Sequence, residues 1–187
     1  MTNSLPTTLP LSKLVTEMQE SATLKMAKMA RELKAQGKDV IDLSLGEPDF
    51  DTPVHIKEAA KKALDDGYTK YTPVNGLLEL RQAIVNKLAR ENDLHYTVNQ
   101  IVVSNGAKQS VYNLCMALLD PGDEVILPAP YWVSYAEIVK MAGGVPVIAN
   151  SSIEQDFKST PEEIEALITD RTKFILYSSP CNPSGSV

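Results

Sequence analysis

Residues 119–135 read LDPGDEVILPAPYWVSY, and this stretch holds the unit that decides the fold. Pro121-Gly122-Asp123 predicts a turn, residues 124–127, which are apolar after Glu124, predict a short buried strand, and residues 131–142 predict a helix. Two prolines stiffen the connection between the strand and the helix. A short buried strand followed by a helix is the repeating unit of parallel α/β sheets.

The same alternation continues on both sides of this unit. Further strands are predicted at residues 101–104, 145–149 and 173–178. Helices are predicted at residues 107–119 and after Thr160-Pro161-Glu162-Glu163, which has the pattern of a capping box. We therefore predict an α/β fold with an open, mostly parallel sheet in three layers.

The first hundred residues read differently. Residues 1–10 predict an extended arm, residues 12–36 a methionine-rich helix, and residues 40–45 a short strand. Thr52 is predicted as the N-cap of a helix whose first residue is Pro53. Residues 77–92 predict an amphipathic helix.

Composition and charge limit the classes of function. Of the 187 residues, 43% are hydrophobic and 22% are charged, which is typical of a globular protein. The net charge of −6 argues against nucleic acid or an anionic membrane as a partner, because either would favour a basic surface. The two cysteines lack metal-ligand spacing, and the first ten residues do not have the pattern of a secretory signal. We expect a cytoplasmic protein with no metal site and no membrane-spanning segment.

Candidate ligand-binding residues follow the predicted strands, where parallel sheets bind ligands. The segment Asn105-Gly106-Ala107-Lys108 begins a helix, whose first-turn N–H groups suit a phosphate, although taken alone the segment is better explained as a plain strand-to-helix turn. Trp132 suits stacking against a flat heteroaromatic ring, or a place in the core. Asn182 lies between two prolines and suits a hydrogen bond to a ligand, or a turn. Gly46 offers an N–H to a carboxylate. Together these groups suit a phosphorylated aromatic cofactor such as pyridoxal phosphate.

Five stretches carry a resemblance to a known family: LSLGEPDFDTP (43–53), YTKYTPVNGLLELRQAI (68–84), VSNGAKQ (103–109), LDPGDEVILPAPYWVSY (119–135) and SSPCNPSG (178–185). In this order they resemble the N-terminal half of a class I, fold-type I pyridoxal-phosphate aminotransferase of the bacterial aspartate aminotransferase type. The resemblance implies a homodimeric enzyme of amino acid biosynthesis that acts on an amino acid, aspartate by default, and a 2-oxo acid. It also implies a seven-stranded sheet in which the strands of this chain are not all neighbours.

The resemblance also implies a role for each candidate residue. Trp132 would stack on the pyridine ring, and Asn182 would bond its phenolic oxygen, so that both also border the substrate. Gly46 would bind the substrate α-carboxylate, and Tyr71 would reach the cofactor phosphate of the partner subunit. The phosphate-binding segment would comprise Gly106, Ala107 and Lys108, with Lys108 also facing the substrate side chain.

The resemblance assigns residues 1–45 to the N-terminal arm and part of a small domain, and residues 46–187 to the first part of the cofactor-binding large domain. The family's Schiff-base lysine and its other acid–base residues would lie beyond Val187. We therefore expect no catalytic residue in this chain and no activity of the chain alone. Two alternatives stay open, namely another fold-type I reaction such as a lyase, and a non-catalytic phosphate-binding or dimerisation module.

Overall fold

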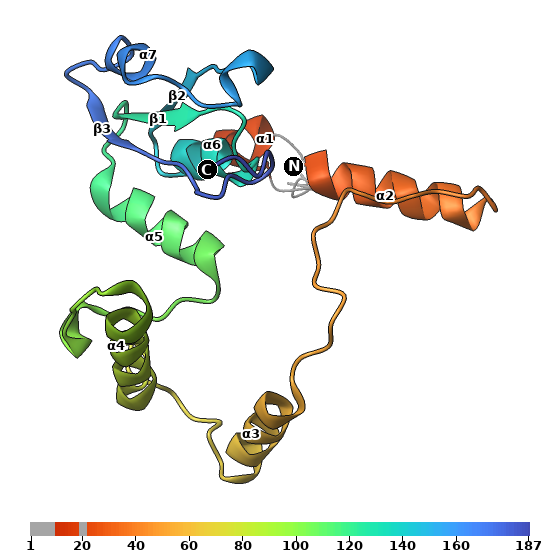
Figure 1. Ribbon diagram of the computed structural model, residues 1–187, viewed down its shortest axis with the longest axis vertical. Coiled ribbons are helices and arrows are strands. Elements are labelled where there is room, and N and C mark those ends of the chain that lie inside the picture. Colours follow the sequence, from red (N-terminus) through yellow and green to blue (C-terminus); the bar gives the residue numbers. More distant parts are fainter. Residues whose placement is uncertain (1–9, 19–21) are drawn as a thin grey trace, which may run out of the picture. The chain divides into compact units, whose positions relative to one another are not determined.

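A computed structural model describes residues 10–18 and 22–187 of the chain, and Figure 1 labels its helices and strands. The chain packs as two compact units, residues 46–107 and residues 1–45 together with 108–187. The predicted arm lies almost wholly outside the described residues, and the predicted domain boundary after residue 45 stays a prediction.

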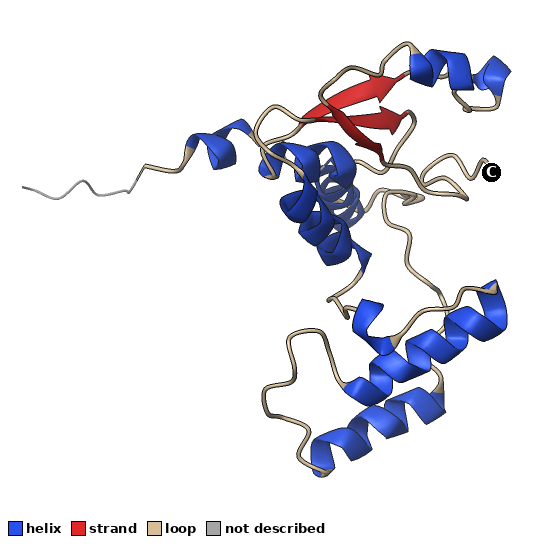
Figure 2. Cartoon of the chain, turned by 90° about the vertical axis from the view of Figure 1, so that its left-hand side faces the viewer, coloured by secondary structure: helices blue, strands red, loops and turns tan. Residues whose placement is uncertain are grey.

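The larger unit contains a three-stranded parallel sheet (Figure 2). Its strands are β1 (Glu124–Pro128), β2 (Val145–Ala149) and β3 (Thr172–Ile175), in the order β2-β1-β3. Both pairings of the central strand β1 are parallel. The predicted α/β class, the parallel sheet and these three strands are therefore confirmed.

Two helices, α5 (Ala107–Leu118) and α6 (Ser134–Met141), pack with β1 to form the core of this unit. The buried cluster consists of Cys115, Leu119, Val125, Leu127, Tyr135, Ala136, Ile138 and Val139. Ile126 is also fully buried, and it faces the other side of the sheet because side chains alternate along a strand. The packing is close at Gly144, where an added Cβ would lie 2.9 Å from Cδ1 of Leu119.

The connection from β2 to β3 contains a 3-10 helix, η2 (Ile153–Gln155), and α7 (Pro161–Glu165). The Thr160 side chain accepts a hydrogen bond from Glu163 N at 3.2 Å, and Glu163 Oε2 accepts one from Thr160 N at 2.8 Å. This reciprocal pair confirms the predicted capping box. Two hydrogen bonds to the Glu163 carboxylate lower its pKa. The larger effect comes from the backbone N–H of Thr160 and the smaller one from the Gln155 side chain.

The N-terminal part of this unit is helical. The described helices are α1 (Lys13–Glu17) and α2 (Ala22–Ala35). The prediction of one helix over residues 12–36 was wrong at Met18, whose extended ψ of 134° ends α1. The predicted strand at residues 40–45 was wrong, and the chain there is irregular. A strand needs a neighbouring strand to complete its hydrogen bonds, and the described residues provide none beside this segment.

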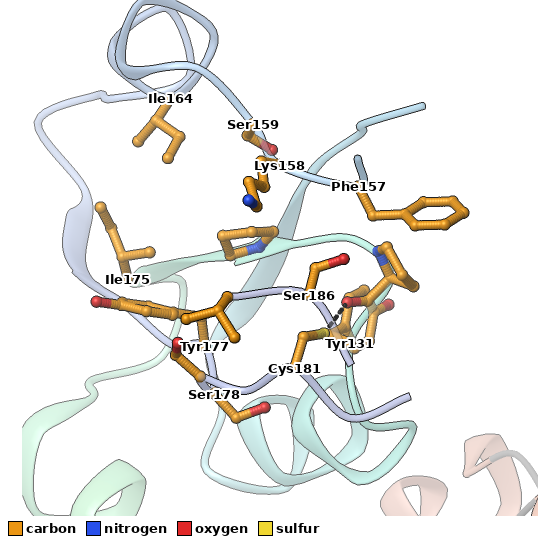
Figure 3. Close-up of a pocket in the computed structure, with 14 residues that line it drawn as sticks. Tyr131, Phe157, Lys158, Ser159, Ile164, Ile175, Tyr177, Ser178, Cys181 and Ser186 are labelled. Carbon is orange, nitrogen blue, oxygen red and sulfur yellow. Dashed lines mark hydrogen bonds between the residues drawn. The ribbon is translucent and has the colours of Figure 1, made fainter. Parts of the chain in front are cut away.

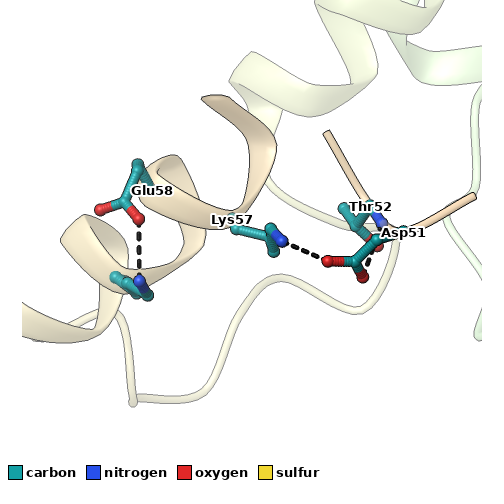
Figure 4. A network of polar contacts seen from close by, with 5 residues as sticks. Asp51, Thr52, Lys57 and Glu58 are labelled. Atoms are coloured by element: carbon teal, nitrogen blue, oxygen red, sulfur yellow. Dashed lines mark hydrogen bonds and ion pairs between the residues drawn. The ribbon is translucent and has the colours of Figure 1, made fainter. Parts of the chain in front are cut away.

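The unit of residues 46–107 contains α3 (Val54–Asp65), α4 (Leu78–Asn92) and the 3-10 helix η1 (Val98–Gln100). The prediction that Thr52 caps α3 was wrong, because Pro53 has extended ψ and occupies the N-cap itself. The Asp51 carboxylate instead accepts hydrogen bonds from Thr52 N at 3.0 Å and from Lys57 Nζ at 2.5 Å, so it ties the loop to the first turn of α3 (Figure 4).

Arg81 is the buried residue of α4, and it links the loop before α4 to the 3-10 helix η1. Its guanidinium donates hydrogen bonds to the carbonyl oxygens of Gly76 at 3.1 Å and Val98 at 2.8 Å. The predicted strand at residues 101–104 was wrong as well. Within it, Val103 N donates one hydrogen bond to Asn75 O at 3.1 Å, and no strand of the described residues pairs with it.

Candidate functional site

The loops that follow β1 and β3 meet at one edge of the sheet. Because the two strands are parallel, their carboxyl ends at Pro128 and Ile175 lie at the same edge. The Cys181 thiol donates a hydrogen bond to the carbonyl oxygen of Pro130, with Sγ and O 3.1 Å apart. The two loops are thus in direct contact at the position where the sequence predicts a ligand.

Trp132 follows β1, and its indole is half-buried against the core cluster. Its ring meets the ring of Tyr135 edge to face, with centroids 5.5 Å apart and an interplanar angle of 89°. The ammonium of Lys108, in the first turn of α5, lies 4.9 Å from the centroid of the Trp132 ring. The structure therefore brings two of the predicted site residues, Lys108 and Trp132, into contact.

Asn182 lies in a loop that closes on itself after β3. Cys181 N donates to Ser186 O at 2.8 Å, Gly185 N donates to Cys181 O at 2.7 Å, and Asn182 N donates to Ser178 Oγ at 3.2 Å. Asn182 is exposed, and within the described part of the chain its side-chain amide makes no hydrogen bond. The loop therefore fixes the backbone and leaves the amide available to a ligand.

Gly106 immediately precedes α5 and has the left-handed φ of +82° that favours glycine. An added Cβ there would meet no atom within 4 Å, so space is open beside the start of the helix. Ala107 is the first helical residue and is exposed. The start of a helix suits an anion, because the positive end of the helix dipole lies there.

The structure does not bring all the predicted residues together. Gly46, Tyr71, Gly106 and Ala107 belong to the unit of residues 46–107. Gly46 and Tyr71 are exposed within that unit, and the Tyr71 ring is fully so. Their predicted roles therefore stay predictions, as do those of the other candidates.

A pocket of about 410 Å³ opens beside the meeting loops, and the sequence did not indicate it (Figure 3). Its wall includes the rings of Tyr131, Phe157 and Tyr177, together with Lys158 and Cys181. None of the predicted site residues lines it. Phe157 reaches the pocket from a backbone with φ of +56°, a conformation rare for an aromatic residue, so no sequence pattern could have predicted its position.

Within residues 10–18 and 22–187, no group of three or more His, Cys, Asp or Glu side chains is arranged to hold a metal ion. In the same residues no helix combines the length and the apolar character needed to cross a bilayer.

The structure is an α/β protein whose parallel sheet carries the loops of Trp132 and Asn182 at its carboxyl edge, which is where such sheets commonly bind ligands. Residues 38–187 match the model of the family described as aminotransferase class I and II. The chain belongs to this family, which confirms the resemblance found in the sequence.

Individual relatives extend this result. The chain is 52% identical over 177 residues to an aspartate/prephenate aminotransferase of Nitrosomonas europaea, covering 95% of this chain and 45% of the relative. It is 51% identical over 177 residues to an aspartate aminotransferase of Geobacillus stearothermophilus, again covering 95% and 45%. The solved aspartate aminotransferase of Rhizobium meliloti matches with a TM-score of 0.88 and 46% identity, over 94% of this chain and 44% of that one. The chain thus spans less than half the length of the relatives it matches.

Proposed function

We propose that this chain supplies the first part of a pyridoxal-phosphate site in an aminotransferase that moves an amino group from an amino acid to a 2-oxo acid. One observation carries the proposal. The cation of Lys108, the ring of Trp132 and the loop of Asn182 gather at the carboxyl edge of the sheet, in a chain about half identical to aminotransferases. A cytoplasmic homodimer is part of the same proposal.

The residues of the larger unit fit such a cofactor chemically. Trp132 offers a flat ring held by core contacts, and Asn182 offers an amide that can donate to an anionic ring oxygen. The first turn of α5, which contains Lys108, offers N–H groups and a cation to a phosphate. When bound, pyridoxal phosphate supplies the electron sink for the reaction at the substrate α-carbon.

The roles of this chain are binding and orientation. Trp132 and Asn182 would fix the plane and the rotation of the cofactor ring, and the start of α5 with Gly106 and Ala107 would hold its phosphate. Gly46 would offer its N–H to the substrate carboxylate. The exposed ring of Tyr71 would reach the phosphate bound by the partner subunit of a homodimer. We assign no proton transfer to any residue of this chain.

The substrates we propose are dicarboxylic. Relatives about 50% identical are named for aspartate alone or for aspartate and prephenate, which are both dicarboxylates. Within the described residues no carboxylate lies within ion-pair distance of Lys108, so its charge is available to a substrate anion. Prephenate is therefore a second candidate amino-group acceptor beside the 2-oxo acid of aspartate.

The test is cofactor binding by the purified chain. We expect saturable binding of pyridoxal phosphate in equilibrium dialysis, and weaker binding after Asn182→Ala, because the amide no longer donates to the ring oxygen. Absence of saturable binding would contradict the proposed site. Borohydride reduction followed by peptide mapping tests the other half of the proposal. A lysine trapped with the cofactor, together with amino-group transfer, would contradict the expectation that no residue here is catalytic.

The names of the relatives favour transamination over a lyase reaction. A non-catalytic binding module would bind the cofactor in the same dialysis experiment. The two differ in a chain extended to the length of its relatives, where an aminotransferase converts aspartate and 2-oxo acids and a module does not.

A further inference from the structure

The Lys108 ammonium covers the ring that is expected to receive the cofactor. Lys108 is exposed on α5, and its Nζ lies 4.9 Å from the Trp132 ring centroid, which is within the range of a cation–π contact. Within the described residues it has no carboxylate partner. The Trp132 indole is thus the described group that contacts this cation.

The two partners in this contact differ in how firmly they are held. Trp132 packs against the buried cluster and makes an edge-to-face contact with Tyr135. Lys108 extends from the exposed surface of a helix on a side chain with four rotatable bonds. A ligand that competes for the ring face would therefore displace the lysine and not the tryptophan.

We propose that Lys108 is a displaceable cover on Trp132, and that a flat heteroaromatic ring must remove it in order to stack on that face. This inference rests on the proposed function, because that function names the ring that competes. An exposed cation–π contact corresponds to a factor of about two to five in an equilibrium constant. The cover lowers the affinity for a neutral flat ring by this factor.

The charge of the ligand sets the direction of the effect. A ring without a phosphate binds more weakly because it must displace Lys108 from Trp132, and it makes no favourable interaction with the displaced ammonium. A phosphorylated ring gains attraction to the same cation after it has moved. Lys108 therefore selects anionic aromatic ligands over neutral ones of the same shape, which makes it a specificity-determining residue of the site.

The experiment compares pyridoxine, which has no phosphate, with pyridoxal phosphate. The variants are Lys108→Ala, which removes the cover, and Lys108→Arg, which keeps a cation able to stack on the ring. Lys158→Ala is the matched control, because Lys158 is a lysine of the same unit that lines the neighbouring pocket and pairs with Asp156 at 2.9 Å. Far-UV circular dichroism verifies that each variant is folded.

Trp132 is the only tryptophan of the chain, so its fluorescence reports on this ring alone. In Lys108→Ala we expect acrylamide to quench the indole more strongly and pyridoxine to bind about two to five times more tightly than in the unmodified chain. We expect pyridoxal phosphate not to gain affinity. Lys108→Arg and Lys158→Ala should match the unmodified chain in all three measurements.

Unchanged acrylamide quenching and unchanged pyridoxine affinity in Lys108→Ala would overturn the inference. The proposed function fails separately, if pyridoxal phosphate binds no form of the chain. In that event the acrylamide result alone decides whether Lys108 covers the ring. If Lys158→Ala bound pyridoxine as tightly as Lys108→Ala, the inference would also be overturned. The gain in affinity would then result from the loss of one positive charge and not from uncovering Trp132.

Discussion

Glu124 and Arg171 are joined twice at the amino ends of β1 and β3. Glu124 N donates to Arg171 O at 2.8 Å, and Arg171 Nη2 donates to Glu124 Oε1 at 2.5 Å. Thr169 Oγ1 donates to the other carboxylate oxygen at 2.6 Å, and the Glu124 side chain is only 6% exposed. This cluster fixes the register of the two strands at the end of the sheet opposite the candidate site.

Arg171→Ala should therefore lower the free energy of unfolding by about 1–3 kcal/mol, because it leaves a buried carboxylate oxygen without its donor. Urea denaturation followed by far-UV circular dichroism measures the change. The matched control is Arg90→Ala. The side chains of Arg90 and Arg171 are 67% and 68% exposed, but the partner of Arg90, Glu91, is itself 47% exposed. An equal loss in both variants would show that burial of the partner does not matter.

Gly76→Ala should destabilise the unit of residues 46–107. Gly76 has φ of +96°, and an added Cβ would lie 2.6 Å from Cγ2 of Val103. We expect a loss of about 1–3 kcal/mol from overpacking together with the backbone cost. Gly67→Ala is the control, since Gly67 has φ of +81° with no atom within 4 Å of the added Cβ. If the clash is the larger cause, adding Val103→Ala to Gly76→Ala should recover stability in urea denaturation.

Trp132→Ala should raise the dissociation constant of pyridoxal phosphate about tenfold, because it removes the stacking surface. Trp132→Phe keeps a flat ring and should raise it less. Equilibrium dialysis measures both, at a temperature where circular dichroism shows folded protein. Equal affinity of all three forms would place the cofactor ring elsewhere.

Cys115 should make stability depend on pH in the alkaline range. Burial raises the pKa of the Cys115 thiol, so the unfolded chain loses this proton at a lower pH than the folded one. The free energy of unfolding should therefore fall as the pH rises above about 8.5. Cys115→Ala should be less stable at neutral pH but show a shallower fall between pH 7 and 10. Parallel curves for the two proteins would contradict this explanation.

Labelling with iodoacetamide tests separately whether Cys115 is buried in the folded chain. Cys115 is fully buried, whereas Cys181 is partly exposed beside the pocket. We expect Cys181 to react in the folded chain and Cys115 to react only after denaturation. Mass spectrometry of the labelled peptides distinguishes the two.

Local patterns predicted the elements whose interactions are local. The Thr160 capping box depends on contacts within a few residues, and it was predicted. The strands β1, β2 and β3 were also predicted, because each is a short apolar run in a chain that supplies its neighbours. The strands predicted at residues 40–45 and 101–104 failed because a strand depends on a partner, and the sequence of the strand does not show whether one is present.

Single residues of the candidate site were predicted, but their contacts were not, because these depend on tertiary packing. The sequence shows that Trp132 follows a strand and that Lys108 lies at the start of a helix, but their contact depends on how α5 packs on the sheet. The wall of the pocket beside them depends on the left-handed backbone of Asp156 and Phe157. No period or motif encodes such a pair of dihedral angles.

The central place of β1 has a consequence for motion. Val125, Ile126 and Leu127 are fully buried, and both edges of β1 are hydrogen-bonded, to β2 and to β3. Backbone amides in such a strand exchange with solvent only through the largest opening of the unit. The loop that carries Trp132 directly follows β1, the strand that opens last. Local unfolding of the peripheral helices would therefore leave the Trp132 ring in place.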